Sequence, residues 1–591
     1  VDWRNGPIAA LYFNYKQDEE FFEVINDRER SGKIKLRRSF KVENGHLIQI
    51  DSPEGIFRRT ETGWEKLDAD SEIAAHRSRG IHAKEKSLPS ILSLITKDQF
   101  EMITTDPERP VIIQGSAGSG KTTVALHRLA WLLHENNSTV KSENTRVIVM
   151  NKSLAVYVSA TLPSMGIDDV QTTTFNSWAL SIIRKSMRTQ PFFKFLTIPS
   201  FVEEIKFSEE ILKALDGLVE KQGKALDEEI KKEFSSRTAH LEGWAKGKGK
   251  PILPRLRDFR HEVKNSKLPE AEKQQKLGFV KKQIANQEDY LQDLYNLLSD
   301  TEHLKKYLKR DAKLVSNLEY LKRLTDKNRL KKNLDYFDMS LVLRFIQIKN
   351  GGLPDGDGGT VLLDHIVIDE AQDFGPVEFA IMMDAVRDKH QITIVGDVAQ
   401  KILFARKFIG WKKVVEYLGL DEDSIIQLEV SFRCTVPIMT LAYKVAGDPK
   451  TVEGRAGPAP EWKKVDNFVD LTEALADWSR GLLRADPYKL VALICRYPKQ
   501  AMELKEEMEN YLPGEVRLGH RDQFSFEPGV LVTNIHQVKG LEFDSVALVE
   551  PDEENYPEKR EESRNMIYVG ITRTQEDLLL ATIRPYSSVL F

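Results

Sequence analysis

The chain has 591 residues, a net charge of −4 and 41% hydrophobic residues, and it contains only two cysteines. This length allows several domains, and the near-neutral charge gives no overall case for binding to nucleic acid or to a membrane surface. Two cysteines make neither a disulfide framework nor a zinc site. We find no signal peptide and no apolar run of spanning length, so we expect a cytoplasmic protein that does not bind membranes.

The first 90 residues predict a small β-rich region. Apolar and polar residues alternate on both sides of Asn44 and Gly45, a dipeptide that is typical of a two-residue hairpin turn. A second alternating stretch surrounds Thr62 and Gly63 and predicts another pair of strands. We therefore expect residues 1–90 to form an N-terminal unit ahead of the helices and buried strands that follow.

Short apolar runs that alternate with helical patterns fill most of the remaining chain. Such alternation is typical of parallel sheets whose two faces are covered by helices, and the runs are too many for one small sheet. We therefore predict two α/β domains, the first made of residues 91–180 and 335–420, the second made of residues 421–591 with a short insert around 436–525. The runs are RPVIIQG at 109, RVIVM at 146, HIVIDEA at 365, ITIVGD at 392, IIQLEV at 425, KLVALICR at 489, VLVTNIH at 530, SVALVE at 545 and LLLAT at 578.

Residues 181–334 interrupt this alternation, because they contain no clear strand and their leucines recur at helical spacing. The stretch from 241 to 335 carries 23 Lys or Arg against 14 Asp or Glu, a net charge of +9. One interpretation is the solvated face of a helical insertion, and the other is a surface that binds phosphates or an acidic partner. Both interpretations predict a helical, basic insertion within the first domain.

A glycine-rich stretch between a predicted strand and a predicted helix fits the pattern G-x-x-x-x-G-K-[ST] without a mismatch. Its backbone N–H groups and the positive end of the following helix would face the phosphates of a nucleotide. Lys121 would reach the β- and γ-phosphates, and the Thr122 hydroxyl would bind Mg²⁺. The predicted site for a nucleoside triphosphate and Mg²⁺ consists of Gly115, Ser116, Ala117, Gly118, Ser119, Gly120, Lys121, Thr122 and Thr123.

Two acidic residues, Asp369 and Glu370, stand at the end of a predicted strand. Carboxylates in such a position are costly unless a cation or another partner compensates their charge. Asp369 fits a role in holding Mg²⁺, and Glu370 fits the base that orients the attacking water. An acidic first turn of a helix would also explain the pair, but the phosphate loop in the same chain favours the catalytic interpretation.

The sequence Asp-Glu-Ala-Gln-Asp after an apolar strand resembles motif II of the UvrD/Rep-like superfamily 1 helicases, and the other segments of that family's set are present in order. Gln99, in TKDQF, matches the glutamine that reads adenine, because an amide can pair with both a donor and an acceptor on the base edge. VIVMNKS and TTTFNSW resemble two segments that touch the nucleic-acid strand. The resemblance covers residues 91–180 and 360–591 and implies two RecA-like domains that bind ATP and Mg²⁺.

Further segments supply the remaining predicted site residues. IVGDVAQKI resembles motif III, where Asp397 and Gln400 would lie near the γ-phosphate. LEVSFRCT resembles motif IV and NMIYVGITRT resembles motif VI, so Arg433 and Arg573 would be two arginine fingers. The resemblance implies that ATP bridges the two domains and that hydrolysis, which removes the charge of the γ-phosphate, lets the cleft open. TNIHQVKGLEFDSV resembles motif V and supplies Lys539, Gly540 and the nucleotide-binding Glu542.

Other features depart from the helicases. In that family, aromatic residues that stack on bases follow motif III, whereas the corresponding positions here hold Leu403 and Ala405. The segment 436–525 is short where the helicases carry a large accessory domain. The N-terminal VDWRNGPIAALYF resembles the segment ahead of the motor in HelD-type proteins, which are UvrD-like ATPases that bind bacterial RNA polymerase and help release it from nucleic acid.

These resemblances imply an ATPase and leave three hypotheses for what it acts on. The first is a HelD-type factor that remodels bacterial RNA polymerase or releases it from nucleic acid. The second is an ATP-dependent single-stranded DNA translocase or 3′–5′ DNA helicase, which the complete motif order and the basic insertion favour. The third is a nucleotide-gated binding module with little turnover, which the intact Glu370 disfavours. We rank the polymerase factor first, and we expect a monomer that also contacts DNA.

Overall fold

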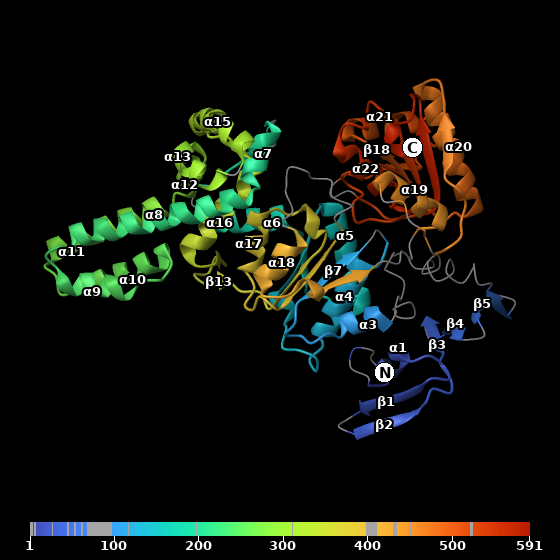
Figure 1. Cartoon of the computed structure of the whole chain (residues 1–591), viewed down its shortest axis with the longest axis horizontal. Helices are drawn as coiled ribbons and strands as arrows, with labels where there is room; N and C mark the ends of the chain where they lie inside the picture. Colours follow the sequence, from blue (N-terminus) through green and yellow to red (C-terminus); the bar gives the residue numbers. More distant parts are fainter. Residues whose placement is uncertain are drawn as a thin grey trace.

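The computed structural model contains two α/β lobes, a helical arm and an N-terminal strand region (Figure 1). The first lobe carries the arm on one side, and the second lobe lies next to the other side of the first (Figure 1). The structure describes residues 4, 7–25, 28–43, 46–52, 55–60, 63–67, 97–115, 118–187, 189–194, 196, 198–309, 311–397, 410–428, 434–447, 449, 451–452, 454–520 and 524–591.

The first lobe is built on a six-stranded parallel sheet with the strand order β16-β7-β15-β14-β8-β9. Its central strands are short, apolar and buried, as expected for strands covered by helices on both faces. Neighbouring residues point to opposite faces, so that Ile112 enters one hydrophobic core and Ile113 enters the other. The strands are β7 Val111–Gly115, β8 Thr145–Val149, β9 Gln171–Thr174, β14 His365–Ile368, β15 Ile392–Gly396 and β16 Ile425–Leu428.

Strand β16 lies in this first sheet although it follows residue 420, where we expected the first domain to end. It pairs in parallel with β7, the strand that leads into the phosphate loop. A Cβ atom added to Gly115 would lie 2.5 Å from the carbonyl oxygen of Leu428, so the close approach of the two strand ends requires glycine. The first sheet therefore extends to Leu428.

Helices cover both faces of the first sheet. Two of them begin at side-chain caps: Asn151 accepts a hydrogen bond from the backbone N–H of Leu154, and Thr174 accepts one from that of Ser177. Helix α16 is buried along almost its whole length, because it lies between the sheet helices and the arm. The helices of this lobe are α3 Lys97–Ile103, α4 Lys121–Leu132, α5 Lys152–Thr161, α6 Phe175–Ser186, α16 Asp338–Asn350, α17 Pro376–Met383 and α18 Trp411–Leu418.

The second lobe is a six-stranded parallel sheet with the order β17-β22-β21-β18-β20-β19. The described part of the segment 436–525 contributes strands and helices to this lobe itself. The elements are α19 Val436–Ala446, β17 Glu461–Lys464, α20 Phe468–Ala485, β18 Leu490–Cys495, α21 Pro498–Met508, β19 Val516–Leu518, β20 Gly529–Asn534, β21 Phe543–Val549, α22 Glu561–Ile571 and β22 Thr574–Thr582.

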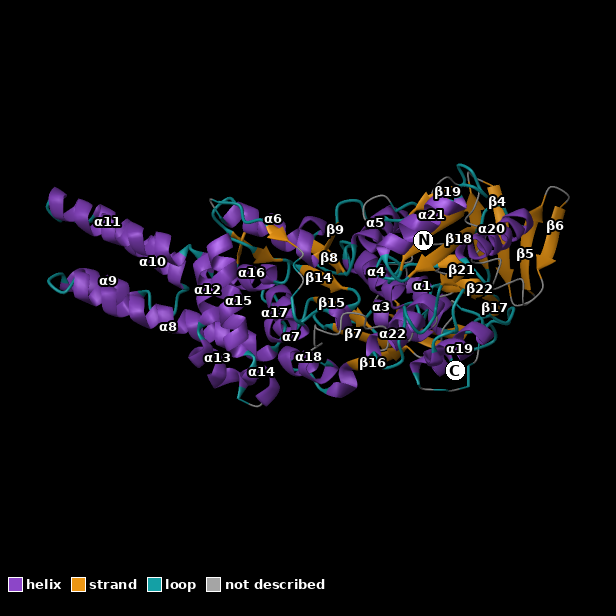
Figure 2. Ribbon diagram, turned by 90° about the horizontal axis from the view of Figure 1, so that it is seen from above, coloured by secondary structure: helices purple, strands orange, loops and turns teal. Residues whose placement is uncertain are grey.

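The helical insertion forms an arm that extends away from both sheets (Figures 1 and 2). Its outer part, α8 to α11, has a hydrophobic core of its own that includes Phe234, Trp244 and Phe259. Among the described helices, none has both the length and the apolar character that crossing a membrane requires. The arm consists of α7 Ser200–Lys206, α8 Glu209–Glu233, α9 Thr238–Lys246, α10 Ile252–Asn265, α11 Glu270–Gln287, α12 Tyr290–Ser299, α13 Thr301–Leu308, α14 Ala312–Ser316 and α15 Leu318–Lys331.

Two pairs of very short strands connect the arm to the first lobe. The parallel pair β10 and β11 joins the two ends of the insertion, and β12 pairs antiparallel with β13 just after α16. The β10–β11 pair holds the start and the end of the insertion close together, so the arm leaves the sheet region at one place. The strands are β10 Phe193–Lys194, β11 Leu334–Asp335, β12 Leu353–Pro354 and β13 Thr360–Val361.

The described part of the N-terminal region contains one helix and two antiparallel sheets. The expected hairpins are confirmed, because β3 pairs with β4 across Asn44 and Gly45, and β5 pairs with β6 at Gly63. Helix α1 does not join these sheets but packs against α3 of the first lobe. The elements are α1 Pro7–Asn14, β1 Glu20–Ile25, β2 Arg28–Lys33, β3 Ser39–Glu43, β4 His46–Ser52, β5 Gly55–Thr60 and β6 Gly63–Leu67.

Candidate functional site

The glycine-rich loop lies between β7 and the first turn of α4. Gly118 and Gly120 have φ values of 76° and 84°, a left-handed conformation that glycine adopts without steric cost. The ammonium group of Lys121 donates a hydrogen bond of 2.9 Å to the carbonyl oxygen of Gly115, at the other end of the loop. The Lys121 side chain therefore reaches back to the residue at which β7 ends. The N-terminus of α4 lines the cleft between the lobes.

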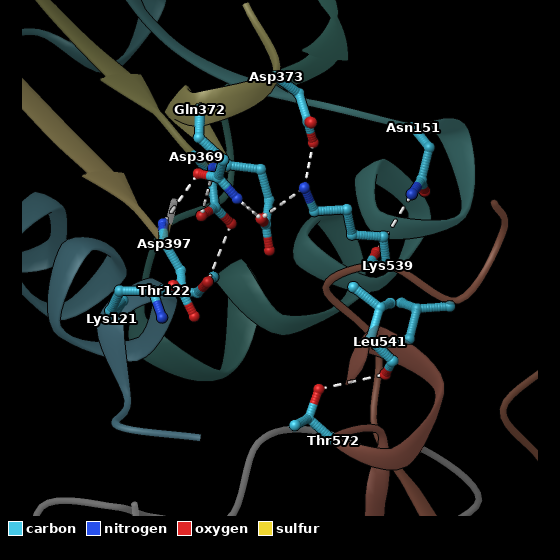
Figure 3. A network of polar contacts seen from close by, with 12 residues as sticks. Lys121, Thr122, Asn151, Asp369, Gln372, Asp373, Asp397, Lys539, Leu541 and Thr572 are labelled. Atoms are coloured by element: carbon cyan, nitrogen blue, oxygen red, sulfur yellow. Dashed lines mark hydrogen bonds and ion pairs between the residues drawn. The ribbon is translucent and has the colours of Figure 1, made fainter. Parts of the chain in front are cut away.

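Asp369 follows β14 and lies beside the first turn of α4 (Figure 3). The Thr122 hydroxyl donates a hydrogen bond of 2.9 Å to its carboxylate. Burial and the neighbouring Glu370 carboxylate raise the pKa of Asp369. A divalent cation at this place would offset both effects, and hydroxyl and carboxylate oxygens are the ligands that Mg²⁺ prefers. The residues present therefore fit a Mg²⁺ site.

Glu370 is buried and has an unusual backbone conformation, with φ 54° and ψ 43°. For a residue other than glycine, this conformation costs on the order of 1–3 kcal/mol, and such strain is concentrated at functional sites. Its carboxylate lies 3.4 Å from the Lys539 ammonium group. Burial alone would raise the pKa of Glu370, but the charges of Lys539, Lys121 and Arg573 outweigh burial and lower it. The carboxylate is therefore held in its charged form.

Gln372 connects the two strand ends that carry the acidic residues. Its side-chain amide donates a hydrogen bond of 2.6 Å to the Glu370 carboxylate, and its side-chain oxygen accepts one of 2.9 Å from the backbone N–H of Asp397 (Figure 3). Gln372 is fully buried. Gln372 is not among the predicted site residues, although it lies within the motif Asp-Glu-Ala-Gln-Asp. The structure places it where it fixes the rotamer of Glu370.

The loop after β20 brings the second lobe into contact with these residues. The Lys539 ammonium group forms a fully buried ion pair with Asp373, and the Lys539 carbonyl oxygen accepts a hydrogen bond of 3.1 Å from the Asn151 side chain (Figure 3). The next residue, Gly540, has φ 80°, and a Cβ atom there would lie 2.6 Å from Leu154. Polar and close-packed contacts thus hold this loop against the start of α5.

Arg573 follows α22 and is almost completely buried. Its guanidinium group donates hydrogen bonds of 3.1 Å to the carbonyl oxygen of Val569 and 3.2 Å to that of Leu541. Glu542 accepts a hydrogen bond of 2.9 Å from Gln575. Glu542 and Arg573 therefore both lie on loops of the second lobe that face the phosphate loop.

One cleft between the lobes contains most of the predicted site residues that the structure describes. Tyr157, a half-buried residue on α5, also lines the cleft, and nothing in its sequence context distinguishes it from an ordinary core aromatic. The lining residues are Gly118, Gly120, Lys121, Thr122, Thr123, Tyr157, Glu370, Gly540, Glu542 and Arg573.

The other predicted residues lie beside the cleft or outside the described residues. Gln99 is buried next to the phosphate loop, and its amide donates a hydrogen bond of 3.4 Å to the carbonyl oxygen of Ser119. Four predicted residues lie outside the described residues, namely Ser116, Ala117, Gln400 and Arg433.

Comparisons with known proteins agree with this arrangement. Residues 95–406 match the family model of the UvrD/REP helicase N-terminal domain, and residues 488–585 match that of the UvrD-like helicase C-terminal domain. No curated protein matches the chain. A solved structure of the C-terminal domain of a "possible DNA helicase" from Lactobacillus plantarum WCFS1 is 24% identical, with a TM-score of 0.24, and covers 27% of this chain and 92% of that one. The first family model spans more than half of the residues, and the chain therefore belongs to the UvrD/Rep helicase family.

Proposed function

We propose that this protein is an ATP-hydrolysing motor that binds Mg–ATP in the cleft between its two parallel sheets. The observation that carries the proposal is the composition of the cleft. Lys121 and Thr122 line it from the first lobe, and Glu542 and Arg573 line it from the second. A triphosphate between these groups would be attracted by cations on both sides, and this arrangement couples nucleotide binding to the distance between the lobes.

The residues of the first lobe have distinct roles in this proposal. Lys121 leaves the carbonyl oxygen of Gly115 and binds the terminal phosphates. Thr122 and Asp369 would hold Mg²⁺, which neutralises phosphate charge when it is bound. Glu370 orients and deprotonates the attacking water. The neighbouring Gln372 supports this assignment, because it already holds the Glu370 side chain in one orientation.

The residues of the second lobe respond to the nucleotide. Arg573 now donates to main-chain carbonyl oxygens, and the γ-phosphate would compete for the same guanidinium group. We propose that Arg433 and Gln400 join it at the γ-phosphate, as the motif order implies, and that Gln99 contacts the adenine. Hydrolysis would remove the charge that holds these groups together, so each turnover would close and then open the cleft.

We propose that the protein acts on bacterial RNA polymerase, in the manner of HelD-type factors. The N-terminal resemblance around Asp2 to Arg4 supports this assignment, as does the absence of stacking aromatics at Leu403 and Ala405. The segment 436–525 also supports it, because its described part belongs to the second parallel-sheet lobe and not to a large accessory domain. Lobe closure would then be transmitted to a protein partner.

A single-stranded DNA translocase or 3′–5′ helicase is the second candidate. The complete order of the motifs favours it, and so do the exposed cations of the arm. Lys264, Lys281 and Lys282 on the outer helices and Lys267 between α10 and α11 are all exposed, and they would interact favourably with a phosphate backbone.

One pair of measurements separates these two candidates. The ATPase rate is measured with and without single-stranded DNA at two salt concentrations, and binding to purified bacterial RNA polymerase is measured by co-elution. A polymerase factor co-elutes and releases stalled polymerase from nucleic acid with ATP, while single-stranded DNA leaves its ATPase rate nearly unchanged. Strong stimulation by DNA with a steep salt dependence, and no co-elution, would instead establish the translocase.

We also propose a division of the chain that follows the sequence analysis. Residues 91–180 and 335–420, extended by β16, form the first ATPase domain, and residues 181–334 form its insertion. Residues 421–591, apart from β16, form the second ATPase domain. Limited proteolysis should therefore cut first in the segments that separate these units and spare the two parallel sheets.

A further inference from the structure

Helix α1 lies outside both segments that match the family models, yet it is packed into the first lobe. The Phe13 ring of α1 stacks on the Phe100 ring of α3, with centroids 4.4 Å apart and an angle of 18° between the planes. Both rings are buried in the hydrophobic core that also includes Ile113 of β7 and Val124 of α4. The contact thus joins a helix that the family does not account for to the nucleotide-binding lobe.

The residue before Phe100 is Gln99, which reaches the phosphate loop. Its amide donates to the carbonyl oxygen of Ser119, and it lies 3.4 Å from the place where a Cβ atom of Gly120 would be. Consecutive residues of a helix point about 100° apart, because the helix has 3.6 residues per turn. One side of α3 therefore faces the loop through Gln99, while an adjacent side faces α1 through Phe100.

The C-terminal end of α3 is held by hydrogen bonds from Arg128. Arg128 of α4 is completely buried and donates hydrogen bonds to carbonyl oxygens at the end of α3 and in the following turn. These bonds hold the C-terminal end of α3 and the turn after it against the phosphate-loop helix. They do not reach the side of α3 that carries Gln99. The adjacent side, which carries Phe100, packs against Phe13, so the ring stack restrains a part of α3 that the Arg128 hydrogen bonds do not hold.

Helix α1 is itself anchored at both ends. The carbonyl oxygen of Arg4, just before the helix, accepts a hydrogen bond of 2.8 Å from the side chain of Asn137, which lies after α4. Near its other end, Arg37 lies 4.4 Å above the Tyr12 ring. The second contact ties α1 to the segment between β2 and β3. Contacts therefore run from the N-terminal strands through α1 to α3 and Gln99.

We propose that Phe13 is a positioning residue for the nucleotide base: it sets the place of Gln99 through Phe100, and so determines how tightly the base of ATP is bound. This inference rests on the proposed ATP site and adds a part of the chain to it. Removing the Phe13 ring leaves a cavity against Phe100, and α3 shifts to fill it. Gln99 then moves away from the base, while Lys121 and the rest of the phosphate loop keep their place.

The experiment measures the affinity of the full chain for Mg–ATP and for inorganic tripolyphosphate with Mg²⁺, which has no base. Phe13→Ala should weaken ATP binding by about fivefold or more, the effect of losing one hydrogen bond, and should leave tripolyphosphate binding unchanged. The value of kcat at saturating ATP should also stay unchanged. Phe13→Tyr, which keeps the ring, should restore ATP binding. Phe22→Ala, which removes an exposed ring from β1, is the matched control and should have no effect.

A double-mutant cycle with Gln99→Ala decides whether Phe13 acts through Gln99. In the Gln99→Ala background, Phe13→Ala should cause no further loss of ATP affinity. Independent, additive losses would overturn the inference, as would equal weakening of both ligands or unchanged ATP binding. If Phe13→Ala fails to fold, Phe13→Leu takes its place in the same cycle. A parent chain that binds neither ligand would instead refute the ATP site itself.

Discussion

Glu370 is restrained by its backbone conformation and by two side-chain contacts. Its left-handed backbone, its hydrogen bond from Gln372 and its ion pair with Lys539 all restrict one carboxylate. We expect Glu370→Gln to bind ATP normally and to lower kcat by about 10²–10⁴-fold, the usual contribution of a general base. The measurement is steady-state ATPase activity together with the equilibrium affinity for ATP.

The matched control for this variant is Glu378→Gln, a buried glutamate that caps α17 outside the cleft. It should keep full turnover, because its carboxylate caps the start of α17 and does not line the cleft. Normal kcat in Glu370→Gln would remove the assignment of Glu370 as the base.

Lys121 is the next residue whose substitution tests the proposed nucleotide site. Its ammonium group closes the phosphate loop through the carbonyl oxygen of Gly115, and a triphosphate would take over that charge. Lys121→Ala should therefore lose measurable ATP binding, with little effect on folding, because one hydrogen bond contributes only about 1 kcal/mol. Lys141→Ala, at an exposed position on the same lobe, serves as control. ATP affinity in the normal range for Lys121→Ala would contradict the phosphate-loop role.

At the scale of elements, the arm is fastened to the first lobe by a buried ion pair. Lys349 of α16 and Asp293 of α12 lie 2.6 Å apart, and both are almost completely buried. Gln222 of α8 also donates a hydrogen bond to Asp293. The ion pair and the hydrogen bond from Gln222 together join three helices at the base of the arm.

Breaking this pair should destabilise the protein strongly, because it leaves one charge buried without a partner. We expect Lys349→Met to lower the free energy of unfolding by about 3–5 kcal/mol, and the double variant Lys349→Met/Asp293→Leu to recover most of that loss. Urea unfolding followed by circular dichroism measures both. If the double variant is as unstable as the single one, packing around α16 and not the charge is responsible.

The sequence predicts those elements whose partners are local. Runs such as Leu490–Cys495 are apolar enough to be strands in any buried sheet, and Asn44 with Gly45 specifies its hairpin through turn geometry alone. It does not predict that β16 pairs with β7, because an apolar run carries no information about which sheet it enters. For the same reason, the ion pair of Lys539 with Glu370 and the stack of Phe13 on Phe100 come only from the three-dimensional structure.

For the whole molecule, the exposed cations of the arm give a prediction about binding. Lys264 is on α10, Lys281 is on α11 and Lys267 lies between these two helices, which belong to the outer part of the arm that extends away from both sheets (Figure 2). Changing all three to Glu should weaken binding to a polyanionic partner and reduce its salt dependence, because fewer counterions are released. The ATPase rate without a partner should stay unchanged. Binding is measured at several salt concentrations.

The control for the arm is Lys499→Glu, a charge change of the same kind on the exposed surface of the second lobe. It should leave both the affinity and the salt slope as they are. An arm variant that binds as tightly as the parent chain, with the same slope, would show that the excess positive charge is only a solvated surface.

The strand order of the first sheet has a consequence for synthesis of the protein. Strand β7 ends at Gly115, but its two neighbours begin only at Ile392 and Ile425. At about 5–20 residues per second, a ribosome needs roughly 14–55 s to make the chain between β7 and β15. During that time both edges of an apolar strand remain unpaired on the nascent chain. We therefore expect ribosome-bound chains that stop before Ile392 to bind chaperones strongly, and chains in which residues up to Leu428 have emerged to be released from them.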